Sequence, residues 1–244
     1  MTIISCLQAV ADLVMPRRCL CCEAVLSPGD VCLCAACEAD IPFTFHSKVR
    51  NNPMAEAFNA LVEKERKDEG YIPYSYAAAL YFYRDGYREI SKSLKYHRNF
   101  AAGKHVSTML GGLLSDSPFF KDVDAVIPIP LHWMRRWSRG YNQAEIIAEG
   151  IASKLNVPVR ADILRRPRHT RSQTSLGPQE RSANTRAAFA ISRKVLKDVP
   201  ELKHILLTDD VFTTGATALA CERALRQIFP HARISVATLA FVGN

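Results

Sequence analysis

The chain has 244 residues, of which 48% are hydrophobic and 23% are charged, and its formal net charge is +8. This length and composition suffice for one full hydrophobic core, so we expect one main domain with a small appendage. The first fifteen residues are fairly apolar, but Asp12 interrupts them and they have no positive charge near their start. This argues against a signal peptide or a membrane span. We expect a short helix here and a cytoplasmic protein without membrane insertion.

Four of the eight cysteines have the spacing of a metal site: Cys19, Cys22, Cys34 and Cys37. They form two C-x2-C pairs with eleven residues between them, and two such pairs close around one tetrahedral ion. Four thiolates favour zinc, in a closed and therefore structural site. Disulfides are the alternative explanation, but they are rare in a reducing compartment. Cys21 and Cys32 are close enough in sequence to replace a neighbouring ligand.

Strands and helices alternate along most of the chain. We expect strands at 76–83, 124–129, 205–208 and 234–242, and helices at 54–62, 87–94, 102–113, 142–155 and directly after 217. The helix at 142–155 has a capping pattern in Asn142 and Glu145. Cys221 falls on the apolar face of the last helix, so we expect it in the core. This alternation predicts an α/β fold with a parallel sheet flanked by helices.

Residues 205–217 read I-L-L-T-D-D-V-F-T-T-G-A-T, a short buried strand followed by two acids and a small-residue turn. A turn between a parallel strand and a helix favours phosphate binding by its backbone N–H groups. The expected phosphate ligands are Thr213, Thr214, Gly215, Ala216 and Thr217. Carboxylates repel phosphate, so Asp209 and Asp210 should instead bind sugar hydroxyls or a hydrated metal ion. A phosphoribosyl group with magnesium carries all these features.

The positive charge is concentrated in one part of the chain. Residues 131–186 hold eleven Lys and Arg against four Asp and Glu, mostly in two segments that flank the helix expected at 142–155. A solvated basic face would explain these segments. Their position near a predicted phosphate site favours anion binding instead.

Residues 205–217 resemble the phosphoribosyl-pyrophosphate (PRPP) motif of type I phosphoribosyltransferases. The chain as a whole resembles the ComF family, whose competence-associated members are related to amidophosphoribosyltransferases. The residues that carry this second resemblance are 126–130, 139–143, Gln173, Arg181, Phe189, and residues 12–16 with the cysteine pairs that follow them. It implies a type I phosphoribosyltransferase-like fold with a zinc-ribbon-like module. We expect an N-terminal helix and zinc-binding module at 1–45, a linker or hood at 46–75 and the phosphoribosyltransferase-like domain at 76–244.

The resemblance also implies roles for individual residues. Asp209 and Asp210 would hold the ribose hydroxyls. Arg135, Arg136 and Arg139, in a pyrophosphate loop at about 130–141, would bind the pyrophosphate of PRPP with magnesium. A second loop, at about 165–179, would close over the reacting centre and exclude water. This closing loop contributes Arg168 and Arg171, and we count Arg171 with the two acids as catalytic candidates.

Two functions stay open from sequence. The first is an active phosphoribosyltransferase with an unknown acceptor. The second, implied by the competence resemblance, is a non-enzymatic DNA-uptake factor with PRPP as a ligand and single-stranded DNA as a partner. Trp133 and Trp137, on either side of two arginines, would suit base stacking. Buried aromatic residues that hold the loop in place would explain them at least as well. Turnover and oligomeric state are also left open.

Overall fold

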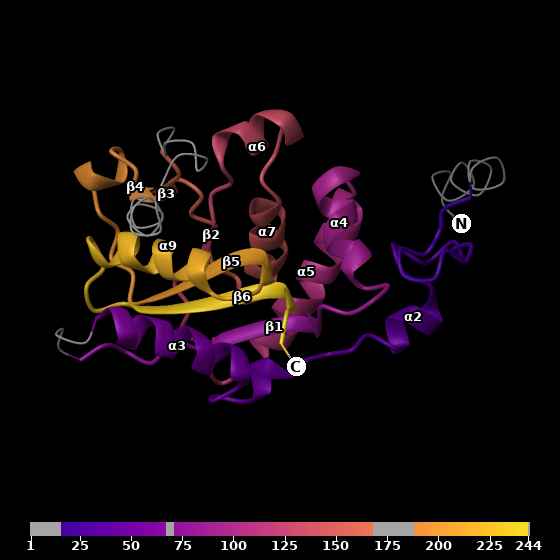
Figure 1. Cartoon of the computed structure of the whole chain (residues 1–244), viewed down its shortest axis with the longest axis horizontal. Helices are drawn as coiled ribbons and strands as arrows, with labels where there is room; N and C mark the ends of the chain where they lie inside the picture. Colours follow the sequence, from indigo (N-terminus) through magenta and orange to yellow (C-terminus); the bar gives the residue numbers. More distant parts are fainter. Residues whose placement is uncertain (1–15, 67–70, 168–187, 244) are drawn as a thin grey trace, which may run out of the picture.

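The computed structural model describes residues 16–66, 71–167 and 188–243 (Figure 1). Its elements, in chain order, are α2 (Ala35–Ala39), the 3-10 helix η1 (His46–Lys48), α3 (Pro53–Glu65), β1 (Ala77–Phe82), α4 (Arg88–Tyr96), α5 (Phe100–Ser115), β2 (Ala125–Pro128), α6 (Trp133–Arg139), α7 (Gln143–Leu155), β3 (Leu164–Arg165), β4 (Ala190–Ile191), the 3-10 helix η3 (Val195–Lys197), β5 (His204–Phe212), α9 (Ala216–Arg226) and β6 (Arg233–Phe241). Among the described helices, none is long and apolar enough to cross a membrane.

Four strands form one parallel sheet in the order β1-β6-β5-β2. Ile205 of β5 is in register with Ala125 on one side and Ile234 on the other. The first five residues of β5 are fully buried, as expected for a parallel strand covered on both faces. The parallel sheet flanked by helices is therefore confirmed.

Helices cover both faces of this sheet (Figure 1). On one face, α3 and α9 pack side chains such as Phe58 and Leu225 against Leu207 of β5. On the other face, α4, α5 and α7 bury a second apolar cluster around Leu206. Cys221 of α9 is fully buried in the first cluster, as predicted. Both faces of β5 are thus closed, which leaves its carboxyl end as the place where polar side chains can gather.

The cysteine-bearing segment packs against the second cluster. Leu33 is fully buried, and the hydroxyl of Tyr87 from α4 donates to the carbonyl of Cys37 at 2.9 Å. A single antiparallel bridge between Phe43 and Tyr81 then leads the chain along the edge of β1. The module is therefore attached to the same core as the sheet.

The strand that carries the acid pair is longer than expected. We expected it to end at residue 208, but β5 continues to Phe212. The reason is long-range, because β6 runs beside it and pairs Asp209 with Thr238 and Phe212 with Phe241. The two acids consequently have strand geometry, in which neighbouring side chains point to opposite faces.

The expected pyrophosphate loop contains a helix, α6. His132 caps its start by accepting from the N–H of Met134 at 3.4 Å, and Gly140 ends it with a left-handed φ of 81°. Its aromatic residues are not buried, since Trp133 is 42% and Trp137 is 86% exposed. The interpretation of buried aromatics that hold the loop in place is therefore wrong.

The segment expected to be a linker or hood, 46–75, contains α3. Asn52 caps this helix by accepting from the N–H of Ala55, and Pro53 occupies its first turn. Phe58 and Val62 are buried against the sheet, so this helix belongs to the core. The boundaries of the three expected parts stay a prediction.

Two predictions fall outside the described residues. They are the N-terminal helix at 1–15 and most of the closing loop at 165–179, with Arg168, Arg171 and Gln173. The structure describes only the base of that loop, where β3 and β4 pair as a short antiparallel ladder.

Candidate functional site

The acid pair lies near the carboxyl end of β5. The N–H of Asp210 donates to Oδ1 of Asp209 at 2.9 Å, and the carboxylate of Asp210 forms an ion pair with Lys95 of α4. Burial, followed by the neighbouring Asp210 carboxylate, raises the pKa of Asp209 well above its ordinary value. Asp209 is therefore ready to gain a stabilising partner such as a hydroxyl donor or a cation.

The turn after β5 is shaped by Gly215. Its φ is 76°, and a Cβ there would meet Cζ of Phe212 at 2.8 Å and Cδ1 of Leu61 at 2.9 Å. Only glycine fits this close, left-handed position without strain. The turn opens directly into α9, whose eleven residues give it a positive N-terminal dipole. Backbone and dipole together make the turn suited to an anion.

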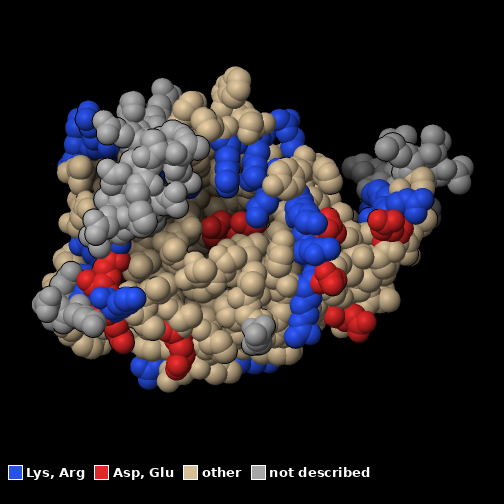
Figure 2. Space-filling model, in the orientation of Figure 1, with Lys and Arg blue, Asp and Glu red and all other residues tan. Residues whose placement is uncertain are grey.

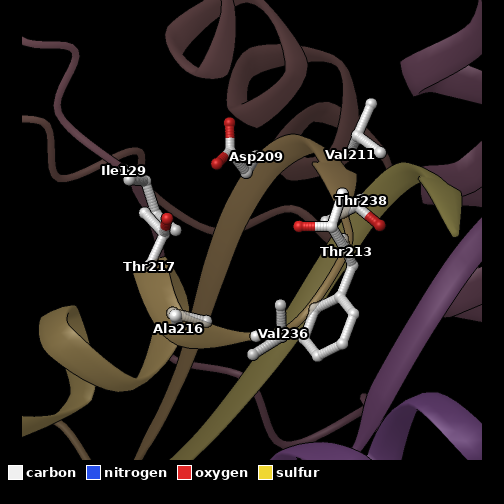
Figure 3. A pocket seen from close by; sticks show the side chains of 11 residues that line it. Ile129, Asp209, Val211, Thr213, Ala216, Thr217, Val236 and Thr238 are labelled. Carbon is white, nitrogen blue, oxygen red and sulfur yellow. The ribbon is translucent and has the colours of Figure 1, made fainter. Parts of the chain in front are cut away.

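A small pocket of about 30 Å³ lies against this turn (Figure 3). In this view Thr217 and Thr213 lie on opposite sides of it, and Asp209 lies above and between them. Of the five expected phosphate ligands, Thr213, Gly215, Ala216 and Thr217 line this pocket. Thr214 is exposed and is not among its lining residues.

A larger cavity of about 310 Å³ adjoins the acid pair, and Asp209 and Thr217 line both spaces. Its lining brings acidic and basic groups together: Lys95, Arg135, Arg139, Arg166, Asp209 and Asp210. Figure 2 shows this hollow with acidic side chains at its base and basic side chains along its rim. Burial and the guanidinium groups of Arg166 and Arg135 lower the pKa of nearby His132, which reflects the positive potential here.

Two of the three predicted pyrophosphate arginines reach the cavity. Arg135 and Arg139 line it, whereas Arg136 forms an ion pair with Glu145 of α7 at 3.2 Å. Arg136 is one residue away from Arg135 on a helix, so its side chain points about 100° away from its neighbour. Glu145 was expected to complete the capping pattern with Asn142, but its carboxylate pairs with Arg136 instead.

Lys95, Arg166 and Gln143 line the cavity without having been predicted as site residues. Gln143 belongs to the segment that carries the family resemblance, so its position was a usable signal. Gln143 is only 4% exposed, and its Nε2 lacks a hydrogen-bond partner among the described residues. Nε of Arg166 is also buried and also lacks a hydrogen-bond partner among these residues. Buried donors of this kind require an acceptor, so the cavity favours an anionic ligand.

The predicted cysteine site is assembled in the structure. The sulfurs of Cys19, Cys22, Cys34 and Cys37 all lie within 4.8 Å of one another. Tetrahedral zinc with Zn–S bonds near 2.3 Å would separate its sulfurs by roughly 3.8 Å. The observed 3.7 Å between Cys22 and Cys34 matches that spacing, so the residues present fit zinc.

The environment of Cys19 also suits a thiolate. Burial opposes its ionisation, but backbone N–H groups of Cys22, Cys34 and Cys21 outweigh it and lower its pKa to about 7. Within the described residues, Cys21 and Cys32 are not part of the four-sulfur group. Cys32 is buried, which raises its pKa to about 12. The possible ligand exchange with these two cysteines is thus not observed.

Comparison with known proteins shows that the chain is similar to a competence protein and to DNA utilization proteins. Competence protein F of Haemophilus influenzae is 35% identical over 105 residues, which are 43% of this chain and 45% of that protein. Competence protein F is a homologue of this chain. DNA utilization protein YhgH of Escherichia coli strain K12 is 30% identical over 102 residues, 42% of this chain and 43% of that protein. The predicted resemblance to the ComF family is therefore confirmed.

These similarities are partial, because the chain spans about half the length of the curated relatives it matches. No family model matches the chain. Among solved structures, orotate phosphoribosyltransferase from Aeropyrum pernix is 16% identical, with a TM-score of 0.33 over 73% of this chain and 77% of that one. Adenine phosphoribosyltransferase from Trypanosoma brucei, in complex with AMP, pyrophosphate and ribose-5-phosphate, is 13% identical, with a TM-score of 0.33 over 74% of this chain and 79% of that one.

Proposed function

We propose that the cavity beside Asp209 and Asp210 binds PRPP with magnesium, as in a phosphoribosyltransferase. The observation that carries this proposal is the arrangement of charge. A left-handed Gly215 turn at a helix N-terminus adjoins two carboxylates, and Arg135 and Arg139 lie across the same cavity. PRPP offers a phosphate, ribose hydroxyls and a pyrophosphate in one molecule. Each of these groups finds a chemically suitable partner here.

Magnesium suits the donor set, because Asp209 and Asp210 supply the hard carboxylate oxygens that this ion prefers. When bound, magnesium would neutralise part of the pyrophosphate charge. The protein's own contribution lies in its arginines. Breaking the bond between C1 of ribose and the pyrophosphate oxygen leaves a cationic sugar and a departing polyanion. Arg135, Arg139 and Arg166 would stabilise that polyanion, and an acceptor nucleophile would then bond to C1.

Calorimetry with PRPP in the presence of magnesium tests the proposal. Replacing both Asp209 and Asp210 by Ala should weaken binding at least tenfold, since each carboxylate makes charge-assisted hydrogen bonds worth about 1.5–3 kcal/mol. Glu201→Ala, which removes an exposed carboxylate that does not line the cavity, is the matched control. Equal affinity in the wild type and the double variant would remove the acid pair from the site. Measuring PRPP consumption with a panel of bases and amines then tests whether the protein catalyses transfer to an acceptor.

A second candidate function is single-stranded DNA binding at the same basic rim. The names of the homologues support it, and so does the 86% exposed Trp137 beside the cavity arginines. An exposed indole among cations suits base stacking combined with phosphate contacts. If DNA phosphates use Arg135 and Arg139, magnesium-PRPP should displace a labelled oligonucleotide in fluorescence anisotropy. Binding without displacement would place DNA elsewhere, and the absence of binding would reject this candidate.

A further inference from the structure

Lys95 reaches from the last turn of α4 into the cavity and forms an ion pair with Asp210. The Lys95 side chain is 27% exposed and that of Asp210 is 13% exposed, so water screens the pair only in part. Asp210 is one of the two acids that we expect to hold the ribose hydroxyls of bound PRPP. The Lys95 ammonium is therefore bound to a carboxylate to which the ribose hydroxyls would have to donate.

The backbone around Lys95 is held firmly. Leu94 is fully buried, and its carbonyl accepts a hydrogen bond from the hydroxyl of Tyr141. The guanidinium of Arg139 lies over the ring of Tyr96, 5.2 Å from its centroid. These contacts tie the end of α4 to α6, which carries the cavity arginines, and to the residue that follows Gly140. Only the four-carbon stem of Lys95 is left to move between the acid pair and the basic wall.

The other walls of the cavity carry several side-chain hydrogen-bond donors. Arg135 and Arg139 line one side, and the buried Nε2 of Gln143 and Nε of Arg166 have no partner within the described part of the chain. Unpaired buried donors cost free energy until a ligand supplies acceptors. A polyanion placed among them would attract the Lys95 ammonium as well, because that group lines the same cavity.

We propose that Lys95 is a specificity-determining residue that distinguishes PRPP from sugar phosphates without a pyrophosphate group. This inference rests on the proposed function, in which PRPP occupies this cavity. The ribose hydroxyls displace Lys95 from Asp210, and the ammonium transfers to an oxygen of the pyrophosphate. A simple sugar phosphate must break the same ion pair but offers Lys95 no replacement. Such a ligand is therefore bound less well.

Calorimetry with two probes, PRPP and ribose 5-phosphate, each with magnesium, tests this idea. Lys95→Met should bind PRPP about tenfold more weakly, the loss expected for one charge-assisted contact of about 1.4 kcal/mol. The same variant should bind ribose 5-phosphate several-fold more tightly, because Asp210 no longer has to release a cation. Lys95→Arg keeps the charge and should retain the wild-type preference. Lys92→Met is the matched control, since Lys92 pairs with Glu89 on the same helix.

The possible outcomes distinguish a failure of this inference from a failure of the proposed function on which it rests. A wild-type chain that binds PRPP, together with a Lys95→Met variant of unchanged preference, overturns the inference alone. Equal loss of affinity for both probes in Lys95→Met also overturns it, because Lys95 would then only support the fold. A wild-type chain without PRPP affinity overturns both proposals. If Lys95→Met fails to fold, loss of preference in Lys95→Arg still contradicts the role of its charge.

Discussion

At the residue scale, the site depends on two neighbouring carboxylates with different surroundings. Asp210 already has a cationic partner in Lys95, whereas Asp209 lies beside the phosphate turn and lines both pockets. Adjacent positions on one strand give the two side chains different directions, although both line the same cavity. The pair therefore provides one carboxylate that is already neutralised and one whose charge is costly until a ligand binds.

The raised pKa of Asp209 predicts that PRPP binding depends on pH. A ribose hydroxyl donates best to the ionised carboxylate, so affinity should fall as pH decreases from 8.5 to 6.5. The loss should approach tenfold per pH unit below the pKa of Asp209. Calorimetry across this range measures it. Phosphate groups of PRPP also titrate near pH 6, so Asp209→Asn provides the reference. A wild-type profile that matches the Asp209→Asn profile would contradict the prediction.

Gly215 predicts a second effect at this scale. In Gly215→Val the new side chain meets Phe212 and Leu61, and its φ of 76° is unfavourable for a β-branched residue. We expect a loss of about 1–3 kcal/mol in the free energy of unfolding, and at least tenfold weaker PRPP binding. Gly112→Ala is the control, because nothing lies within 4 Å of its Cβ position. Chemical denaturation and calorimetry check both effects, and an unperturbed Gly215→Val would show that the turn can relax.

At the element scale, the cysteine module and the sheet domain are stabilised in different ways. Among the described residues of the module, the buried hydrophobic side chains are Cys19, Leu26, Cys32, Leu33 and Ile41, whereas the sheet contributes most of two larger apolar clusters. A small segment with so little core depends on a metal or disulfides for its order. The module should therefore respond to metal loss more than the sheet does.

Elemental analysis should find one zinc per chain in freshly purified protein. Cys34→Ser removes one of the four sulfurs, so we expect it to lose zinc and to become sensitive to protease within the module. PRPP affinity should change little, because none of the cysteines that the structure describes lines the site cavity. Cys21→Ser is the control and should keep a full equivalent of zinc. Less than half an equivalent in the wild type would contradict the zinc assignment.

At the scale of the whole molecule, stability is linked to buried histidines. His46 is 4% exposed and packs its ring edge-on against Phe241, at 5.2 Å between centroids. Burial lowers its pKa to about 4. The unfolded chain binds this proton near pH 6.5, before the folded chain does. The contribution of neutral His46 is therefore present above pH 6.5 and is lost as pH falls towards 4.

From this pH range we expect the titration of His46 to lower the free energy of unfolding by about 2 kcal/mol between pH 7.5 and pH 5. His46→Phe replaces the ring without a titrating group, so its loss over the same range should be smaller by about that amount. Urea denaturation at the two pH values measures the difference. His97→Phe is a control at an exposed position. Equal losses in the wild type and His46→Phe would show that His46 takes up its proton without unfolding.

Patterns that depend on near neighbours in the chain were readable from sequence. The two C-x2-C pairs indicated the four sulfurs that meet, because each knuckle is a local turn. The alternating elements indicated a parallel sheet, and residues 213–217 indicated the turn at Gly215 and the start of α9. Asn142 capped its helix as expected, since a cap bonds to a backbone N–H two residues away.

Contacts between distant segments were decided only by the tertiary structure. Lys95 and Asp210 are more than a hundred residues apart in sequence. They meet because α4 covers one face of the sheet that contains β5. β5 extends through the acids because β6 lies beside it, and Arg136 turns away because Glu145 of α7 offers it a partner. The sequence by itself thus determined which residue types the site contains. Packing determined which of them face the cavity, because side-chain direction follows from the placement of whole helices and strands.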